Sequence, residues 1–412
     1  ASLLLPGMQS LIHGNFEGAA QKKVYALVGA AAAIAAAVGP LLGGFITTYL
    51  SWRVGFALEV LIIGVVLSGI RLVRDVPYTG PRVIDLVGAV LSVLGMGGIV
   101  LSILVWQEGG GSVGALLAIG AVGLVALIFW LGRRKLQGKP ALLDPDLFSS
   151  KVFRLGITQQ MLQQIALGGL MIALPIYLQM VLEYNAMGAG LSLAPLSLSM
   201  FGVALLAGKR AGHRRPSSII RVGYLLVTAG VLALIPVVPR ADSGWYLALP
   251  LMAAGSGLGL LVSQLNNYTL SPISEERVSE AAGVNSAAGS FGLSFGLAFA
   301  GAIMLAALSI SFSNNAEAST VLSPAEQQRV AEALENDAQV MSNTQLEELL
   351  ADQPEATRAE IVRINTESRP PALQVALVIP LLAGLVGLLN SFRMMRLPEP
   401  APSGAPDGVV LG

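Results

Sequence analysis

Apolar runs long enough to cross a lipid bilayer recur along almost the whole chain. About 18 consecutive apolar residues suffice for a helix to cross the hydrocarbon core, and most of the runs here are longer. Charged residues make up only 12% of the chain, whereas about 25% is usual in a soluble domain. A large soluble helical protein would need polar stripes at helical spacing, and most of these runs have none. The sequence therefore predicts an all-α polytopic membrane protein.

We expect about ten complete transmembrane helices and a remnant of an eleventh, residues 1–13, which look like the end of a span. The complete spans are expected at 24–49, 54–72, 85–106, 112–132, 153–182, 188–208, 218–239, 245–271, 282–312 and 371–392. One long polar segment, 313–370, contains three short stretches with helical spacing. It forms either a cap over the outer mouth or a solvated excursion without chemistry. The tail at 396–412 is rich in Pro and Gly and is expected to be disordered.

The distribution of positive charge predicts the orientation, because Lys and Arg concentrate in short cytoplasmic loops. We place the loop at 14–23 inside the cell and let the spans alternate. Of the 25 Lys and Arg residues, all then lie inside except Arg53, Arg240, Arg329, Arg358, Arg363 and Arg369. The C-terminus is therefore predicted to be cytoplasmic, and 313–370 to lie outside.

The rarity of reactive side chains excludes several classes of protein. The chain has no cysteine and only two histidines, His13 and His213, so thiol catalysis, disulfides and histidine-based metal sites are not expected. A membrane-embedded enzyme would need clustered carboxylates, histidines or serine–lysine pairs at membrane depth, and Glu59 is the one carboxylate well inside a span. We expect no enzymatic activity, no cofactor, no metal and no nucleic-acid partner.

The segment "AAAVGPLLGGF" at 35–45 places helix-weakening residues inside an apolar span. In water, Gly and Pro cost a helix about 1 and 3 kcal/mol relative to Ala. In a bilayer, however, helices associate by close packing at small residues, and a proline bends the helix. Gly39, Pro40, Gly43 and Gly44 therefore predict tight contact with a neighbouring helix.

The complete GPxxGG pattern, followed by "SWRVGF" at 51–56, resembles the fourteen-span drug:proton antiporter family of the major facilitator superfamily. That family carries this pattern, its antiporter motif, near the outer end of span five. Further similar stretches are "DLVGAVLSVLG" at 85–95, "LPIYLQMVLEYNAMGAGLSLAP" at 174–195 and "GVNSAAGSFGLSFGLA" at 283–298. By this resemblance the chain is N-terminally truncated, with spans one to three missing. The basic loop "GKRAGHRRP" at 208–216 departs from the family pattern, because it lacks the acidic residue of the signature loop.

The resemblance implies three structural units followed by the tail. Residues 1–75 would be the remnant of an N-terminal helix bundle, 76–140 two extra linker spans, and 141–395 a C-terminal six-helix bundle. It implies a monomer in the bacterial plasma membrane that uses protons to export amphipathic drugs by alternating access. Two alternatives stay open: a transporter, in either direction, of an endogenous metabolite, and a truncated protein that does not transport.

Polar side chains at membrane depth mark the candidate substrate pathway, because they are costly there. The candidates lie at similar depth on three spans and are Gln159, Gln160, Gln163, Gln164, Gln264, Asn266, Asn267 and Asn285. Alternatively, these amides simply bridge neighbouring helices. Glu59 is the candidate for proton coupling, because burial favours the neutral form of a carboxyl group, which could then exchange protons near neutral pH. The alternatives for Glu59 are pairing with a residue of the missing helices or contact with water at the outer surface.

Overall fold

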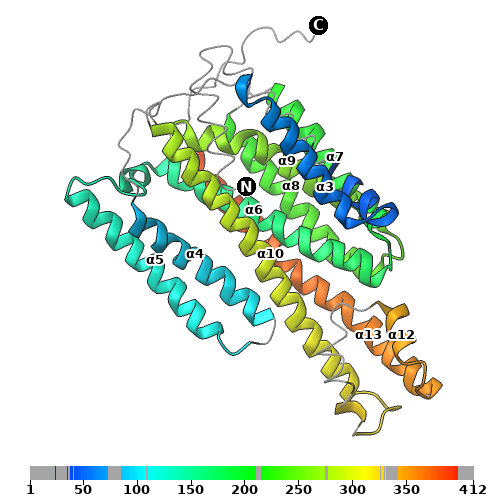
Figure 1. Ribbon diagram of the computed structural model, residues 1–412. Coiled ribbons are helices and arrows are strands. Elements are labelled where there is room, and N and C mark those ends of the chain that lie inside the picture. The colour runs from blue at the N-terminus through cyan, green and yellow to red at the C-terminus, as the bar shows by residue number, and fades with distance from the viewer. Residues whose placement is uncertain are drawn as a thin grey trace.

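The computed structural model describes residues 24, 35, 38–39, 41–72, 85–107, 110–209, 215–273, 277–324, 326–328, 330 and 342–397. Within these residues the regular secondary structure is entirely helical (Figure 1). Eight of the described helical segments are long and apolar enough to cross a membrane. The predicted all-α polytopic fold is confirmed.

The described helices follow one another in chain order. They are α3 (Trp52–Ser68), α4 (Leu86–Gln107), α5 (Val113–Leu136), α6 (Lys151–Ile176), α7 (Ala186–Lys209), α8 (Pro216–Val237), α9 (Ala248–Leu270), α10 (Val278–Glu317), α12 (Asn343–Leu349), α13 (Glu355–Ala376) and α14 (Val378–Met394). Residues 41–49 are also helical. After Pro175, α6 passes into a π-helical turn, Tyr177–Val181. Such turns are rare and occur often at functional sites.

Helices α6 to α10, α13 and α14 share one apolar core, in which backbones touch at glycines. A Cβ atom on Gly168 of α6 would lie 2.6 Å from the carbonyl oxygen of Leu293 on α10. In return, a Cβ on Gly292 or Gly296 would lie 2.5 Å from a carbonyl oxygen of α6. Two helices in lipid have no hydrophobic driving force for association, so close van der Waals packing of this kind holds them together instead.

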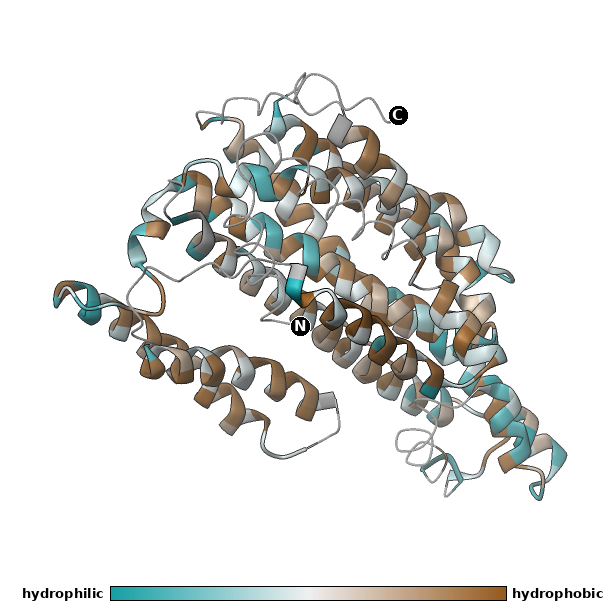
Figure 2. Ribbon diagram, turned by 45° about the horizontal axis from the view of Figure 1, so that its top comes forward, coloured by the Kyte–Doolittle hydropathy of each residue, from teal (hydrophilic) through white to brown (hydrophobic). Residues whose placement is uncertain are grey.

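The hairpin of α4 and α5 lies to one side of this bundle, with α10 between the two (Figure 1). Its helices meet at Gly98 and Gly120, where a Cβ on Gly98 would lie 2.8 Å from the Gly120 Cα. The hairpin packs on α10 through a small cluster centred on Ile103, Ala298 and Ala302. Most of α5 remains exposed, and the brown along its ribbon in Figure 2 marks its hydrophobic residues.

A single carboxylate, Asp85, holds the start of α4 to the end of α5. It is 5% exposed and accepts hydrogen bonds from the backbone N–H groups of Gly88 and Leu142 and from the Trp130 indole, at 2.9 to 3.1 Å. The largest single influence on the Asp85 pKa is burial, which raises it. The hydrogen bonds and the charge of Arg134 together outweigh burial, so the Asp85 pKa is lowered from its usual value.

Replacing Asp85 with asparagine is expected to destabilise the hairpin by about 1 to 3 kcal/mol, because an amide donor would then face other donors in a buried site. Thermal unfolding of the purified protein in detergent measures this effect. Asp146→Asn is the matched control, since Asp146 pairs with Lys135 on the surface, where its side chain is 54% exposed, and exposed pairs contribute about 0 to 1 kcal/mol. Equal stability of the two variants would contradict the proposed structural role of Asp85.

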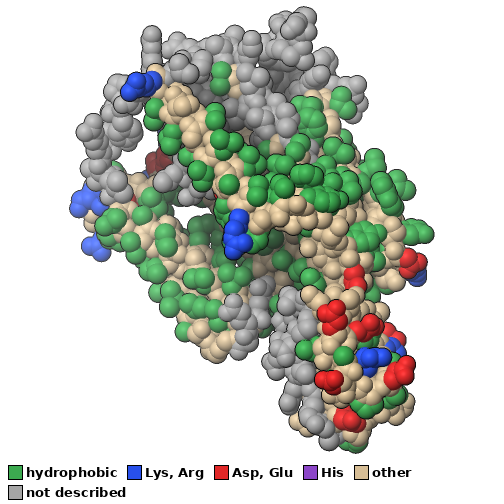
Figure 3. Space-filling view, turned by 45° about the vertical axis from the view of Figure 1, so that its right-hand side comes forward, with side chains coloured by type: hydrophobic (Ala, Val, Ile, Leu, Met, Phe, Trp, Pro, Cys, Tyr) green, Lys and Arg blue, Asp and Glu red, His purple; other side chains and the backbone are tan. Residues whose placement is uncertain are grey.

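Helices α10 and α13 extend beyond the rest of the bundle at one end (Figure 1). The 40 residues of α10 span about 60 Å at 1.5 Å per residue, twice the roughly 30 Å of the hydrocarbon core. The segment expected as a loop, 313–370, thus contains the end of α10, α12 and the first turns of α13. Together these form what we call the end lobe, whose acidic surface is red in Figure 3. Hydropathy alone predicts that a helix ends where its apolar run ends. In the structure, packing between α10 and α13 lets both helices continue into the polar segment.

Candidate functional site

The four glutamines of α6 point in two different directions. Gln159 and Gln163 are buried, at 0% and 2% exposure. The Gln159 side chain donates from Nε2 to the carbonyl oxygen of Gly387 on α14 at 2.9 Å. The Tyr224 hydroxyl of α8 donates to the backbone oxygen of Gln159 at 2.5 Å. Gln159 therefore braces α6 against α8 and α14, as the bridging alternative describes. Among the described residues, Oε1 of Gln159 and Oε1 of Gln163 are buried without a hydrogen-bond partner.

The other pair, Gln160 and Gln164, is partly exposed and lies toward α10. A Cβ atom on Gly289 of α10 would lie 3.4 Å from Nε2 of Gln160 and 3.7 Å from Cγ of Gln164. The glycine thus lets both side chains pack close to the backbone of α10.

Asn285 lies one helical turn before Gly289 on α10 and continues the same polar face. Its side chain is 4% exposed and donates from Nδ2 to Oδ1 of Asn266 on α9 at 2.7 Å. We call Gln160, Gln164, Asn285 and Asn266 the polar strip, because it runs across α6, α10 and α9. Asn267 is exposed beside it, whereas Gln264 is buried, at 1% exposure, with its Nε2 3.4 Å from Oγ of Ser263.

Two oxygens of the polar strip are open acceptors. Within the part of the chain that the structure describes, Oε1 of Gln164 and Oδ1 of Asn285 are buried and have no hydrogen-bond partner. Buried polar atoms in native proteins nearly always have one, supplied by protein or by water. An amide oxygen accepts hydrogen bonds, so these two atoms can take an N–H or O–H group from water or from a bound molecule.

The antiporter-motif residues differ sharply in their surroundings. A Cβ on Gly44 would lie 2.6 Å from the Ala186 carbonyl oxygen, at the start of α7. The contact is reinforced one turn later, where Oγ1 of Thr48 accepts a hydrogen bond from the Met187 N–H at 3.0 Å. Gly39 and Gly43 have no described atom within 4 Å of such a Cβ, and Pro40 lies outside the described residues.

Glu59, the candidate for proton coupling, is exposed on α3. None of the residues of α3 is buried among the described residues. The described contacts therefore give the Glu59 carboxylate no partner within the bundle, and its role stays a prediction. The described residues also contain no group of three or more His, Asp or Glu side chains that could hold a metal ion.

The sequence pattern does not single out two buried polar residues of the bundle, Tyr224 and Arg369. Tyr224 is fully buried on α8, and a single tyrosine in an apolar span gives little signal. Arg369 is 6% exposed on α13, although the topology places it in the outer segment. The signal that could have found it is its position immediately before the last apolar run, at "SRPPAL".

Comparison with known proteins identifies the family. The family model described as Major Facilitator Superfamily matches residues 1–85 and 82–297. The chain is 33% identical over 296 residues to the puromycin resistance protein pur8 of Streptomyces alboniger, covering 70% of this chain and 58% of that protein. It is 28% identical to a putative multidrug resistance protein MdtD of Pectobacterium atrosepticum, over 65% of this chain and 57% of that protein.

A probable transport protein HsrA of Haemophilus influenzae is 24% identical, over 68% of this chain and 60% of that protein. The chain thus spans less than two thirds of the length of these curated relatives. The family model, the helical fold and the relatives named for drug resistance agree with one another. The chain belongs to the Major Facilitator Superfamily of membrane transporters, and its similarity lies with the drug:proton antiporters of that superfamily.

Proposed function

We propose that this transporter exports amphipathic drugs or related small molecules by alternating access, driven by the inward flow of protons. The observation that carries the proposal is the polar strip, which crosses three helices and presents two open acceptors. Amides at membrane depth that remain available to a ligand are typical of a substrate pathway. The names of the relatives, which refer to puromycin and to multidrug resistance, support drugs as the substrate class.

The contact at Gly44 supports the alternating-access part of the proposal. It joins the helix at 41–49 to α7, and these helices belong to different halves of the predicted architecture. A backbone-to-backbone contact between small residues allows two helices to slide or separate without side chains interlocking. We further propose that the protein is a monomer in the plasma membrane with its C-terminus in the cytoplasm.

Removing the polar strip is expected to weaken transport. In Asn285→Ala the link to Asn266 and one open acceptor are lost, so we expect drug efflux to fall on the order of tenfold, which corresponds to about 1.4 kcal/mol. Efflux of a fluorescent cation such as ethidium from loaded cells measures this. Asn314→Ala is the matched control, since Asn314 is exposed on the same helix in the end lobe. Unchanged efflux in Asn285→Ala, at equal protein level, would refute the pathway.

Glu59 is proposed to couple transport to protons. In Glu59→Gln the side chain keeps its size and loses its titrating group. We therefore expect ethidium efflux to become independent of an imposed pH gradient, with a rate near that of de-energised vesicles. Glu317→Gln, which changes an exposed glutamate of the end lobe, is expected to leave the gradient dependence intact. A Glu59→Gln protein that still responds fully to the gradient would exclude this residue as the coupling site.

A further inference from the structure

Three arginines lie at the end of the bundle opposite the end lobe, where α8 begins and α14 ends. The two helices run antiparallel and in close contact, since a Cβ on Gly384 of α14 would lie 2.8 Å from Oγ1 of Thr228 on α8. Arg221 belongs to the first turns of α8, and Arg393 and Arg396 to the end of α14. We call these three residues the basic corner.

Arg221 rests on the last turn of α14 without meeting a negative charge there. Its Nη1 lies 3.0 Å from Sδ of Met395, and a thioether is only a weak acceptor. Its guanidinium carbon lies 5.7 Å from the centre of the Phe392 ring, whose face attracts a cation. Arg393 and Arg396 each follow one of these two contact residues directly, and their spacing of three places them on one adjoining face of α14.

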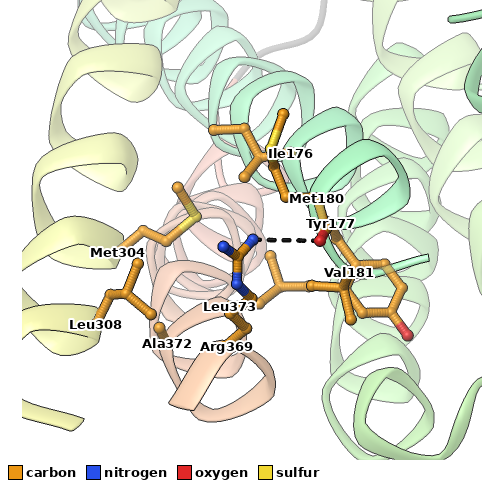
Figure 4. A pocket seen from close by; sticks show the side chains of 9 residues that line it. All are labelled: Ile176, Tyr177, Met180, Val181, Met304, Leu308, Arg369, Ala372 and Leu373. Carbon is orange, nitrogen blue, oxygen red and sulfur yellow. Dashed lines mark hydrogen bonds between the residues drawn. The ribbon is translucent and has the colours of Figure 1, made fainter. Parts of the chain in front are cut away.

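The ion pairs formed among the described residues include none of the three arginines. Arg369, at the other end of the bundle, is different: it is buried and donates to the Met180 carbonyl oxygen (Figure 4). In the basic corner, Arg393 and Arg396 are exposed and Arg221 is partly exposed. Their charges can therefore be met by an anion from outside the described chain.

The depth of the basic corner is that of lipid head groups. The last apolar run begins at Pro371, and from there to Arg393 a helix rises about 33 Å at 1.5 Å per residue. This length is close to the roughly 30 Å of the hydrocarbon core. Arg393 therefore lies where the hydrocarbon ends and the phosphate groups of a bilayer begin.

An exposed leucine lies one helical turn deeper in the membrane than each of two corner arginines. Leu225 follows Arg221 by four residues on α8 and is 53% exposed. Leu389 precedes Arg393 by four residues on α14 and is 66% exposed. Residues four apart share a helix face, so each of these faces has a cation at head-group level and an apolar side chain below it.

We propose that the basic corner binds the phosphate head group of an anionic phospholipid, whose acyl chains lie along Leu225 and Leu389. Arginine presents a planar fork of donors that matches a phosphate. Each cation near a membrane surface favours anionic lipid about fivefold. The proposal goes beyond export and does not depend on it, because lipid binding is measured without transport.

Native mass spectrometry of the purified protein in detergent, titrated with dioleoyl-phosphatidylglycerol or dioleoyl-phosphatidylcholine, tests the proposal. The two lipids have the same chains and a phosphate, but only phosphatidylglycerol has a net negative charge. We expect one phosphatidylglycerol to bind at least tenfold more tightly than phosphatidylcholine, and this preference to shrink as salt is added. Equal binding of the two lipids by the unchanged protein would overturn the proposal.

Triple variants locate the site. Arg221→Gln/Arg393→Gln/Arg396→Gln is expected to weaken phosphatidylglycerol binding at least tenfold. The matched control removes as much charge from exposed cations of α5, α6 and their connection, and it is expected to keep the preference: Arg133→Gln/Lys139→Gln/Lys151→Gln. Equal loss in both triple variants would overturn the site, because the lipid would then respond to overall charge.

Two further measurements keep the result independent of misfolding. Arg221→Lys/Arg393→Lys/Arg396→Lys retains the three charges and is expected to retain the preference for phosphatidylglycerol. Loss of that preference in a lysine variant that elutes as a single species would contradict binding by charge. Displacement of the lipid by inorganic phosphate at constant ionic strength would overturn the proposal too, since the occupant would then be a free anion.

Discussion

Gly44→Val is expected to lower drug efflux at least tenfold. The added Cβ would lie 2.6 Å from the Ala186 carbonyl oxygen and 3.0 Å from the Met187 Cα. Both are backbone atoms, so neither can rotate away. The helix at 41–49 must therefore shift from α7, and overpacking of this kind costs about 1 to 3 kcal/mol. Efflux of ethidium from cells with equal amounts of each protein measures the effect.

Gly43→Val is the matched control for this experiment. It adds the same side chain one residue earlier, where no described atom lies within 4 Å of the new Cβ. We expect efflux close to that of the unchanged protein. If Gly43→Val and Gly44→Val lose efflux equally, the motif acts through backbone flexibility, and the contact with α7 is not its purpose.

Gly296→Leu is expected to have the largest effect on stability. A Cβ at this position would lie 2.5 Å from the Ile165 carbonyl oxygen and 2.9 Å from the Ile165 Cα. Since Ile165 belongs to α6, the substitution pushes apart the two helices that carry most of the polar strip. We expect a loss of at least about 3 kcal/mol, at or above the upper end for overpacking, because the obstructing atoms are backbone.

Thermal unfolding in detergent, followed by the amount of monodisperse protein remaining, measures this loss. Gly283→Leu, on the same helix, is the control, because no described atom lies within 4 Å of a Cβ there. A Gly296→Leu protein as stable as Gly283→Leu would contradict the close packing of α6 on α10.

The sequence predicted those helices whose boundaries coincide with changes in hydropathy. Helix α7 covers the span expected at 188–208, and α9 covers most of that at 245–271. Hydropathy along the sequence could not predict how far α10 and α13 continue, because their extensions are polar. These extensions are held by contacts between segments distant in sequence. Within the end lobe, for example, Asn315 donates to Ser368 at 2.9 Å.

For the candidate site, the sequence predicts residue types and their approximate depth, but it cannot predict in which direction each side chain points. At helical spacing, Gln159 and Gln163 share one face of α6, and Gln160 and Gln164 share another. Only the neighbouring helices decide which pair faces inward, and Tyr224 and Gly387 bury the first. The link between Asn285 and Asn266 likewise depends on the rotation of α9 relative to α10. Arg369 lies in the segment 313–370 that the sequence places outside, and its burial on α13 depends on contacts with segments distant in sequence, such as Met180.

In proton-driven export, the downhill movement of protons drives the drug against its own concentration gradient. The most direct test is accumulation of ethidium by proteoliposomes that contain the purified protein and have an imposed pH gradient. We predict accumulation only when the interior is acidic, and its loss when a protonophore collapses the gradient. Two results would contradict proton-driven export: ethidium accumulation that the protonophore does not reduce, or no ethidium accumulation in vesicles that contain folded protein.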